Sequence, residues 1–400
     1  MQRLRSVLGI ATPEARLQPS GLNCVFNGSP SSFADYVAAT RDMLTKAHAK
    51  LGTADPEKIV DGNAPFELKP PAGFPSGHDK PYRRGVLLTH GLTGSPYFMR
   101  HLAAFFQQNG FRVMAVLLPG HGTQPGDLLD VTWQEWAKAV AYGSDRLAEE
   151  VDEVYLAGYS TGGALSVYQS LRDDRVRGLF LFSPAFKISP RAAWANWHRL
   201  YSWLIPSGKW LAIKLDQDIY KYESVTKHAA AQTYALTREL DAQLQRHGID
   251  IPVFAAASAE DATVDTPAIV EFIARAHHPS SKLVLYTTAP EKFLPDIPAG
   301  KLEWVNSVVP EQNILSSAHT SIVLPAEDTH YGIAGEYSNC VHYYPDEMEK
   351  YAACMQHPEQ DWQGEITEEN LKAGVLRRLM YNPNFAALKI SMQKFIESLP

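Results

Sequence analysis

The chain has few cysteines, no long apolar run and no excess of positive charge. Only three of its 400 residues are cysteine, Cys24, Cys340 and Cys354, too few for a disulfide framework in a chain of this length, although a Cys340–Cys354 bridge stays open. No stretch of about 18 apolar residues is present to cross a bilayer. The formal net charge of −7 argues against general nucleic-acid binding.

The beginning of the sequence does not read as a secretory signal. Its first ten residues include two arginines, but their apolar stretch is short and interrupted. We therefore expect a cytoplasmic protein. A hydrophobic content of 45% can bury a large core, so the composition indicates a globular chain of one elaborated domain or two.

The segment 154–165 contains the pattern Gly-x-Ser-x-Gly, with Ser160 at its centre. An apolar run typical of a buried strand precedes it, and small and apolar residues at helical spacing follow, which predicts strand, tight turn and helix. At such a turn the hydroxyl of Ser160 projects into a cleft, and the N–H of Thr161 points the same way at the positive end of the helix dipole. The bare pattern is common by chance, so this context is what makes Ser160 a candidate nucleophile.

Apolar strands alternate with amphipathic helices on both sides of this turn. This alternation predicts parallel strands covered by helices on both faces, an α/β fold with a mostly parallel central sheet. Ligands of such sheets bind at the carboxyl ends of the strands, where Ser160 falls. The expected strands are 85–90, 111–118, 154–159 and 178–183, and the expected helices are 97–109, 133–150 and the one after Ser160.

Three motifs in this region resemble the α/β-hydrolase superfamily, and within it the carboxylesterase and monoacylglycerol-lipase branch. They are His90-Gly91-Leu92-Thr93-Gly94-Ser95, Leu118-Pro119-Gly120-His121-Gly122 and Gly158-Tyr159-Ser160-Thr161-Gly162-Gly163. The resemblance covers residues 84–186 well and reappears over 251–323. It implies that the backbone N–H groups of Leu92 and Thr161 form an oxyanion hole, and we expect His90 and His121 to be structural.

A serine nucleophile needs a histidine that accepts its proton and a carboxylate that orients the imidazole. In the resembled fold these follow in the order serine, acid, histidine. The strand-like run 251–258 leads into an acidic loop, where Asp261 fits the family's aspartate just past the strand. Glu260 and Asp265 are its competitors.

The histidine has to be chosen from fourteen. His319 lies in a segment similar to the family's Ser-Gly-His followed by small and apolar residues, and His330 is the runner-up. The separation of Asp261 and His319 exceeds what one strand and one helix require. We expect a helix at 267–276, strands at 282–288 and 301–309, and a proline-rich insertion in this interval.

Residues 186–250 are expected to form a helical cap inserted before the acid-bearing strand. Between residues 187 and 214 the segment has tryptophans, lysines and arginines but no acidic residue. Such a segment suits packing of the cap on the core, an apolar roof over an acyl chain, or a peripheral contact with a membrane. The candidate substrate-binding residues are Trp194, Trp197, Tyr201 and Phe186.

The expected domain organisation has six parts. No cofactor is expected, because acyl transfer by a serine needs none. No metal site is expected either, since His330, His342, Asp346 and His357 of the C-terminal insertion match no metal-ligand spacing. The oligomeric state stays open. The parts are an N-terminal extension (1–81, with a helix at 33–51 and an irregular lead-in at 65–81), the first part of the core (82–185), the cap (186–250), the second part of the core (251–324), the insertion (325–383) and a closing helix (384–400).

Together these features predict a serine hydrolase that cleaves carboxylic esters with apolar acyl chains through an acyl-enzyme. Ser160 attacks, His319 moves the proton and Asp261 orients His319. The expected partner is a small-molecule ester or lipid, and no nucleic acid. Two alternatives stay open: the same fold acting on an amide, a carbon–carbon bond or in perhydrolysis, and a noncatalytic lipid-binding member of the fold.

Overall fold

The structure, a computed structural model, describes residues 14–23, 26–28, 30–188, 208–356 and 361–399. Within them an eight-stranded sheet runs in the order β1-β3-β2-β4-β5-β8-β9-β10, with every neighbouring pair parallel except β1 and β3. Its strands are β1 (Phe66–Leu68), β2 (Tyr82–Thr89), β3 (Phe111–Val116), β4 (Val151–Tyr159), β5 (Val176–Phe182), β8 (Val253–Ser258), β9 (Lys282–Tyr286) and β10 (Leu302–Val305).

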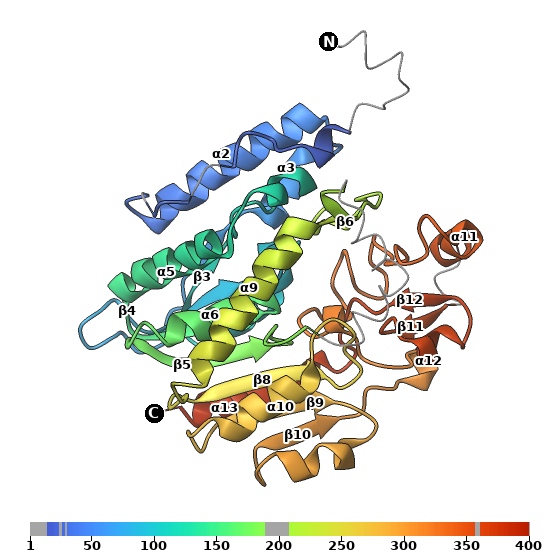
Figure 1. Cartoon of the computed structure of the whole chain (residues 1–400). Helices are drawn as coiled ribbons and strands as arrows, with labels where there is room; N and C mark the ends of the chain where they lie inside the picture. The colour runs from blue at the N-terminus through green and yellow to red at the C-terminus, as the bar shows by residue number, and fades with distance from the viewer. Residues whose placement is uncertain (1–13, 24–25, 29, 189–207, 357–360, 400) are drawn as a thin grey trace.

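Successive side chains of the central strands enter two separate cores, one on each face of the sheet. On β4, Leu156 belongs to one core, while Tyr155 and Ala157 belong to the other. The first core is covered by α5 (Trp133–Glu150), α6 (Thr161–Ser170), α9 (Lys227–Leu244) and α10 (Thr266–Arg275) (Figure 1). The second core is covered by α4 (Arg100–Gln108) and α13 (Phe385–Glu397). The predicted α/β class, mostly parallel with helices on both faces, is confirmed.

Two of the predicted helices, 33–51 and 133–150, match the structure to the residue. Helix α2 (Phe33–Leu51) begins after Ser32, whose side chain accepts the N–H of Asp35. Helix α5 begins with a capping box formed by Thr132 and Glu135. The expected helix 97–109 is instead divided into a 3-10 turn, η2 (Pro96–Met99), and α4.

The prediction that residues 65–81 are irregular is partly wrong. It contains β1, which pairs with β3 and extends the central sheet by one antiparallel strand. Three residues carry too little periodicity to reveal a strand, and the pairing joins residues 45 to 49 positions apart. The short helix α3 (Pro56–Asn63), which precedes β1, was also not foreseen.

The described part of the expected cap is not purely helical. It contains a two-stranded ribbon, β6 (Trp210–Ala212) with β7 (Val225–Thr226), followed by α9. Helix α9 packs beside α5 and α6, and its buried residues Ala229, Leu236 and Leu240 join the core of that face (Figure 1). Residues 227–244 are thus a covering helix of the sheet.

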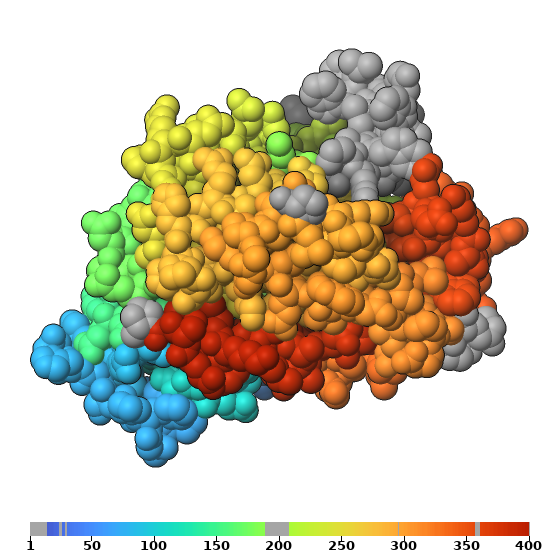
Figure 2. All heavy atoms as spheres, turned by 90° about the horizontal axis from the view of Figure 1, so that it is seen from below, coloured from blue at the N-terminus to red at the C-terminus, as the bar shows by residue number. Residues whose placement is uncertain are grey.

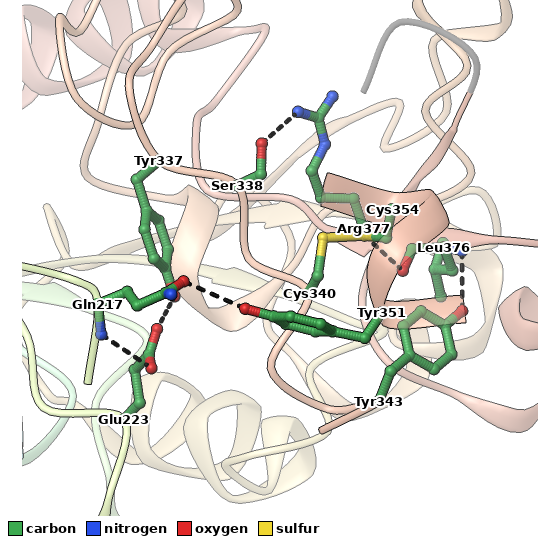
Figure 3. The surroundings of a disulfide bond; sticks show 10 residues. All are labelled: Gln217, Glu223, Tyr337, Ser338, Cys340, Tyr343, Tyr351, Cys354, Leu376 and Arg377. Atoms are coloured by element: carbon green, nitrogen blue, oxygen red, sulfur yellow. Dashed lines mark hydrogen bonds between the residues drawn. A yellow bond between two sulfur atoms is a disulfide. The ribbon is translucent and has the colours of Figure 1, made fainter. Parts of the chain in front are cut away.

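The insertion 325–383 lies at one end of the sheet, beside the 208–226 segment (Figure 1). It contains α11 (Met348–Gln356), the parallel pair β11 (Trp362–Gly364) and β12 (Leu376–Arg378), and α12 (Glu368–Leu371). A disulfide joins Cys340 and Cys354, the bridge that the sequence left open. Tyr337 and Tyr351 reach from the insertion to Glu223 and Gln217, with hydrogen bonds of 2.6 and 3.1 Å (Figure 3).

The closing helix α13 lies at the surface, between the N-terminal part of the chain and the β9–β10 region (Figure 2). Among the described helices, none is both long and apolar enough to cross a bilayer. The 3-10 helices complete the described elements: η1 (Ala15–Leu17), η3 (Pro125–Leu129), η4 (Pro290–Lys292), η5 (Leu294–Asp296), η6 (Pro310–Gln312) and η7 (His319–Ser321).

Candidate active site

Ser160 occupies a strained corner between β4 and α6. Its backbone has φ 54° and ψ −118°, a conformation that residues with a β-carbon rarely adopt. The N–H of Ser160 donates to the carbonyl of Phe182 (2.9 Å), and the N–H of Ala185 donates to the carbonyl of Ser160 (3.0 Å). These bonds to the end of β5 and the loop after it hold the corner in place.

The two glycines of the motif are required by close backbone contacts. A β-carbon on Gly162 would lie 2.1 Å from the carbonyl oxygen of Thr89, at the end of β2. A β-carbon on Gly158 would lie 2.2 Å from the carbonyl oxygen of Gly162. Only glycine permits this approach of the turn to the neighbouring strand.

The structure brings His319 and Asp261 to Ser160. The hydroxyl of Ser160 lies 3.0 Å from Nε2 of His319, and Nδ1 of the same ring lies 2.7 Å from Oδ2 of Asp261. Both side chains are buried, with exposed fractions of 6% for His319 and 0% for Asp261. The other carboxylate oxygen, Oδ1, accepts the N–H groups of Thr263 (2.7 Å) and Val264 (2.9 Å), which fixes the orientation of the carboxylate.

The competing candidates, Glu260, Asp265 and His330, contact other groups. Glu260 accepts a hydrogen bond from the hydroxyl of Ser258, and Asp265 is the residue before α10. His330 faces Asp218 (3.3 Å) and Glu336 (3.4 Å). The geometry at Ser160 is therefore formed by Asp261 and His319 and not by these alternatives.

Leu92 and Thr161 present their backbone N–H groups in the neighbourhood of Ser160. Thr161 is the next residue in the chain, and a β-carbon on Gly91 would lie 3.0 Å from Cβ of Ser160, so the 91–92 backbone runs against the serine. In the described part of the chain, neither N–H has a hydrogen-bond partner. Two unpartnered donors beside the Ser160 hydroxyl are consistent with the oxyanion hole that the resemblance implies, and that role stays a prediction.

Two buried imidazoles hold the loop that carries Leu92. Nε2 of His121 accepts the N–H of Thr93 (3.1 Å), and Nε2 of His90 accepts the N–H of Leu118 (3.0 Å). Burial lowers the pKa of His121 to about 4, and burial together with the neighbouring His121 lowers the pKa of His90 well below its usual value. Both rings are thus neutral acceptors near pH 7, the structural role expected for them.

Two contacts to His319 were not foreseen from the sequence. The hydroxyl of Tyr159 donates to the carbonyl of His319 (3.1 Å), and the N–H of His319 donates to Oε2 of Glu365 (2.9 Å). Tyr159 is adjacent to the motif serine and could have been considered. Glu365 is 46 positions beyond His319 in the insertion, and no sequence pattern marks it.

Of the candidate substrate-binding residues, Trp194, Trp197 and Tyr201 lie outside the described residues. Phe186 is 9% exposed and packs against Phe272 at a ring distance of 4.5 Å. It lines a pocket of about 620 Å³ between α9 and α10 to which Ser160 does not contribute.

Among the described residues, no three or more His, Cys, Asp or Glu side chains are arranged so that they could hold a metal ion. His357, one of the histidines considered for a metal, lies outside them.

Comparison with known proteins identifies the family. Residues 80–290 match the family described as serine aminopeptidase, S33, and the chain belongs to this family of α/β hydrolases. The match contains Ser160 and Asp261 and ends before His319.

Two curated relatives match shorter stretches. A thermostable monoacylglycerol lipase from Bacillus sp. (strain H-257) is 34% identical over 109 residues, 27% of this chain and 44% of the relative. A carboxylesterase from Bacillus subtilis (strain 168) is 32% identical over 85 residues, 21% of this chain and 35% of the relative. The chain thus spans less than half the length of these relatives.

Among solved structures, this chain is similar to one whose description concerns two metagenome-derived lipolytic enzymes, LipS and LipT. The sequence identity between the two chains is 23%. The similarity covers 58% of this chain and 93% of that chain, with a TM-score of 0.45.

Proposed function

We propose that this protein is a serine hydrolase that cleaves carboxylic esters, with Ser160 as nucleophile, His319 as general base and acid, and Asp261 as the residue that orients His319. The observation that carries the proposal is the continuous series of hydrogen bonds from the Ser160 hydroxyl through the His319 ring to Asp261, at 3.0 and 2.7 Å. A hydroxyl is a weak nucleophile until a neighbouring base accepts its proton, and this series supplies that base.

The reaction proceeds in two halves. Oγ of Ser160 attacks the carbonyl carbon of the ester while its proton passes to Nε2 of His319, and the N–H groups of Leu92 and Thr161 hold the negative oxygen of the tetrahedral intermediate. The imidazolium then protonates the departing alkoxide, which leaves an acyl-enzyme and a free alcohol. Water, deprotonated by His319, attacks the acyl-enzyme, and release of the acid restores the serine hydroxyl. No cofactor takes part.

The family and its relatives support two different bonds as the target. The family description names an aminopeptidase, which favours an amide, whereas both curated relatives are named as ester hydrolases. Their matched stretches lie within the same α/β architecture, and an ester is the more reactive of the two bonds for one acyl-transfer site. We therefore place the ester first, with an apolar acyl chain as in the lipase relative, and the amide second.

The test is turnover of p-nitrophenyl esters of increasing acyl length, with matched p-nitroanilides as the amide arm. We expect ester turnover that changes with chain length and little anilide turnover. Faster turnover of the anilides would move the assignment to amide cleavage.

Ser160→Ala tests the nucleophile. Turnover should fall by roughly 10⁴-fold or more while the fold is kept, because the attacking oxygen is removed. A matched control is Ser170→Ala, on the same helix α6, whose hydroxyl donates only to the carbonyl of Val167. If Ser160→Ala kept most of the esterase activity, the assigned nucleophile would be wrong.

A fluorophosphonate probe separates catalysis from a noncatalytic role. The probe should label Ser160 of the wild-type protein, and labelling should disappear in Ser160→Ala. A folded wild-type protein that neither labels nor turns over any ester would indicate the noncatalytic lipid-binding alternative.

Cytoplasmic location and a peripheral membrane contact through the 186–250 segment also stay predictions. Vesicle binding that weakens with salt would support the membrane contact.

A further inference from the structure

A buried carboxylate from the C-terminal insertion contacts the backbone of His319. Glu365 directly follows β11, and its side chain is fully buried. Its Oε2 accepts the N–H of His319 (2.9 Å), and its Oε1 accepts the N–H of Ile366 (2.9 Å). The insertion thus reaches the residue that carries the proposed general base.

Arg378 connects this carboxylate to the loop that carries Asp261. It ends β12, directly opposite Gly364 of β11, and its Nε lies 2.9 Å from Oε1 of Glu365. Its Nη2 donates to Oε2 of Glu365 (3.1 Å) and to Oγ1 of Thr263 (2.8 Å). The N–H of Thr263 in turn donates to Oδ1 of Asp261. The guanidinium of Arg378 therefore links Glu365, which contacts His319, to Thr263, which contacts Asp261.

The pair is charged inside the protein. Burial raises the pKa of Glu365, but the charge of Arg378 and the hydrogen bond from the His319 N–H outweigh burial and hold this pKa below its usual value. The carboxylate near pH 7 is therefore ionised. A buried ion pair contributes little net stability compared with an apolar pair of similar size, so stability alone is a weak reason for its presence.

The backbone of His319 needs such support because no regular element holds it. His319 begins the three-residue turn η7, and the described residues on either side of it form no long helix or strand between β10 and α11. The imidazole must stay aligned with both Ser160 and Asp261. A displacement of about 1 Å in a reacting group can cost about 10²-fold in rate.

We propose that Glu365 and Arg378 are positioning residues that set the backbone of His319 and the Asp261 loop relative to each other. The insertion 325–383 then completes the acid–base half of the site. This inference rests on the proposed function, since it assigns a role toward His319 and Asp261.

The test compares Glu365→Ala and Glu365→Gln in the full chain. Glu365→Ala removes both the acceptor and the charge, and we expect kcat to fall by about 10²-fold with KM changed less than about threefold, because the reacting groups and not the substrate pocket are displaced. Glu365→Gln keeps an oxygen that can accept the His319 N–H, and it should lose about tenfold. In the double variant Glu365→Gln/Arg378→Gln no buried charge is left unpaired, but the bond from Arg378 to Thr263 is also lost, so kcat should be no higher than that of Glu365→Gln. A return to wild-type kcat would show that an unpaired charge caused the loss, and would overturn the positioning role.

Asp328→Asn is the matched control. Asp328 is also a buried carboxylate of the insertion and accepts the N–H groups of His330 and Tyr331, but it bonds to Tyr97 and His101 and not to the proposed site. This variant should lower the melting temperature and leave kcat per labelled active site within about twofold of wild type. A loss of kcat equal to that of Glu365→Ala would show a general effect of insertion stability and overturn the inference.

Each kcat is calculated per active site that the fluorophosphonate probe labels, so that misfolded molecules do not lower the value. If Glu365→Ala does not fold, Glu365→Gln decides: a loss of kcat below twofold overturns the positioning role. Failure of the proposed function looks different, because wild-type protein would then show neither ester turnover nor labelling of Ser160.

Discussion

Replacing Asp261 by asparagine tests the orientation of His319 with almost no change of shape. Oδ1 of Asp261 accepts two N–H groups, from Thr263 and Val264. Asparagine keeps an oxygen for these donors, so its NH₂ group must take the place of Oδ2, 2.7 Å from Nδ1 of His319. Nδ1 then has to accept a hydrogen bond, and the ring proton moves to Nε2.

With its proton on Nε2, the imidazole faces the Ser160 hydroxyl, 3.0 Å away, as a donor and cannot accept the serine proton. The same substitution in a serine protease triad costs about 10⁴ in kcat, which corresponds to about 5 kcal/mol in the activation free energy. We expect a loss of this size for Asp261→Asn. KM should stay near its wild-type value, since no substrate contact is removed.

The assay is steady-state turnover of a p-nitrophenyl ester, with circular dichroism as the check on folding. Asp265→Asn and Glu260→Gln are the matched controls, because they neutralise the two competing carboxylates of the same loop and should each stay within about threefold of wild type. Asp261→Asn that keeps more than a tenth of the wild-type kcat would refute the assignment. A large loss in Asp265→Asn instead would transfer the role to that residue.

Two further predictions concern stability. The Cys340–Cys354 disulfide closes a loop of about 14 residues, so Cys340→Ser/Cys354→Ser should lose about 3 kcal/mol of unfolding free energy. The control Cys24→Ser should not. A melting temperature that reductant leaves unchanged would contradict the bridge. His121 is neutral in the fold with a pKa of about 4 against 6.5 when free, so stability present above pH 6.5 falls by about 3 kcal/mol towards pH 4. In denaturant unfolding, His121→Asn should flatten this decline of the unfolding free energy with falling pH, whereas His78→Gln, at an exposed histidine, should not. Equal slopes in the wild-type protein and His121→Asn would refute the prediction.

Features that depend on neighbours in the chain could be predicted from the sequence. Helix α5 has its apolar period, its capping box and its end within 20 residues, and its predicted bounds match the structure. The Ser160 turn is similarly local, since a β-carbon on Gly158 would lie 2.2 Å from the carbonyl oxygen of Gly162, four residues along the chain. The parallel sheet follows from the alternation of such segments. These predictions needed no knowledge of distant contacts, because each pattern contains its own physical cause.

What the sequence by itself determined is therefore the α/β class and the position of the candidate nucleophile. Only the tertiary structure decided which partners meet it: His319, not His330, lies at Ser160, although both are histidines in loops far along the chain. Strand β1 and the contact of Glu365 with His319 were likewise invisible, because each depends on packing between residues about 45 positions apart. Local periodicity reports the face that a segment buries, but it does not report which distant side chain completes the contact.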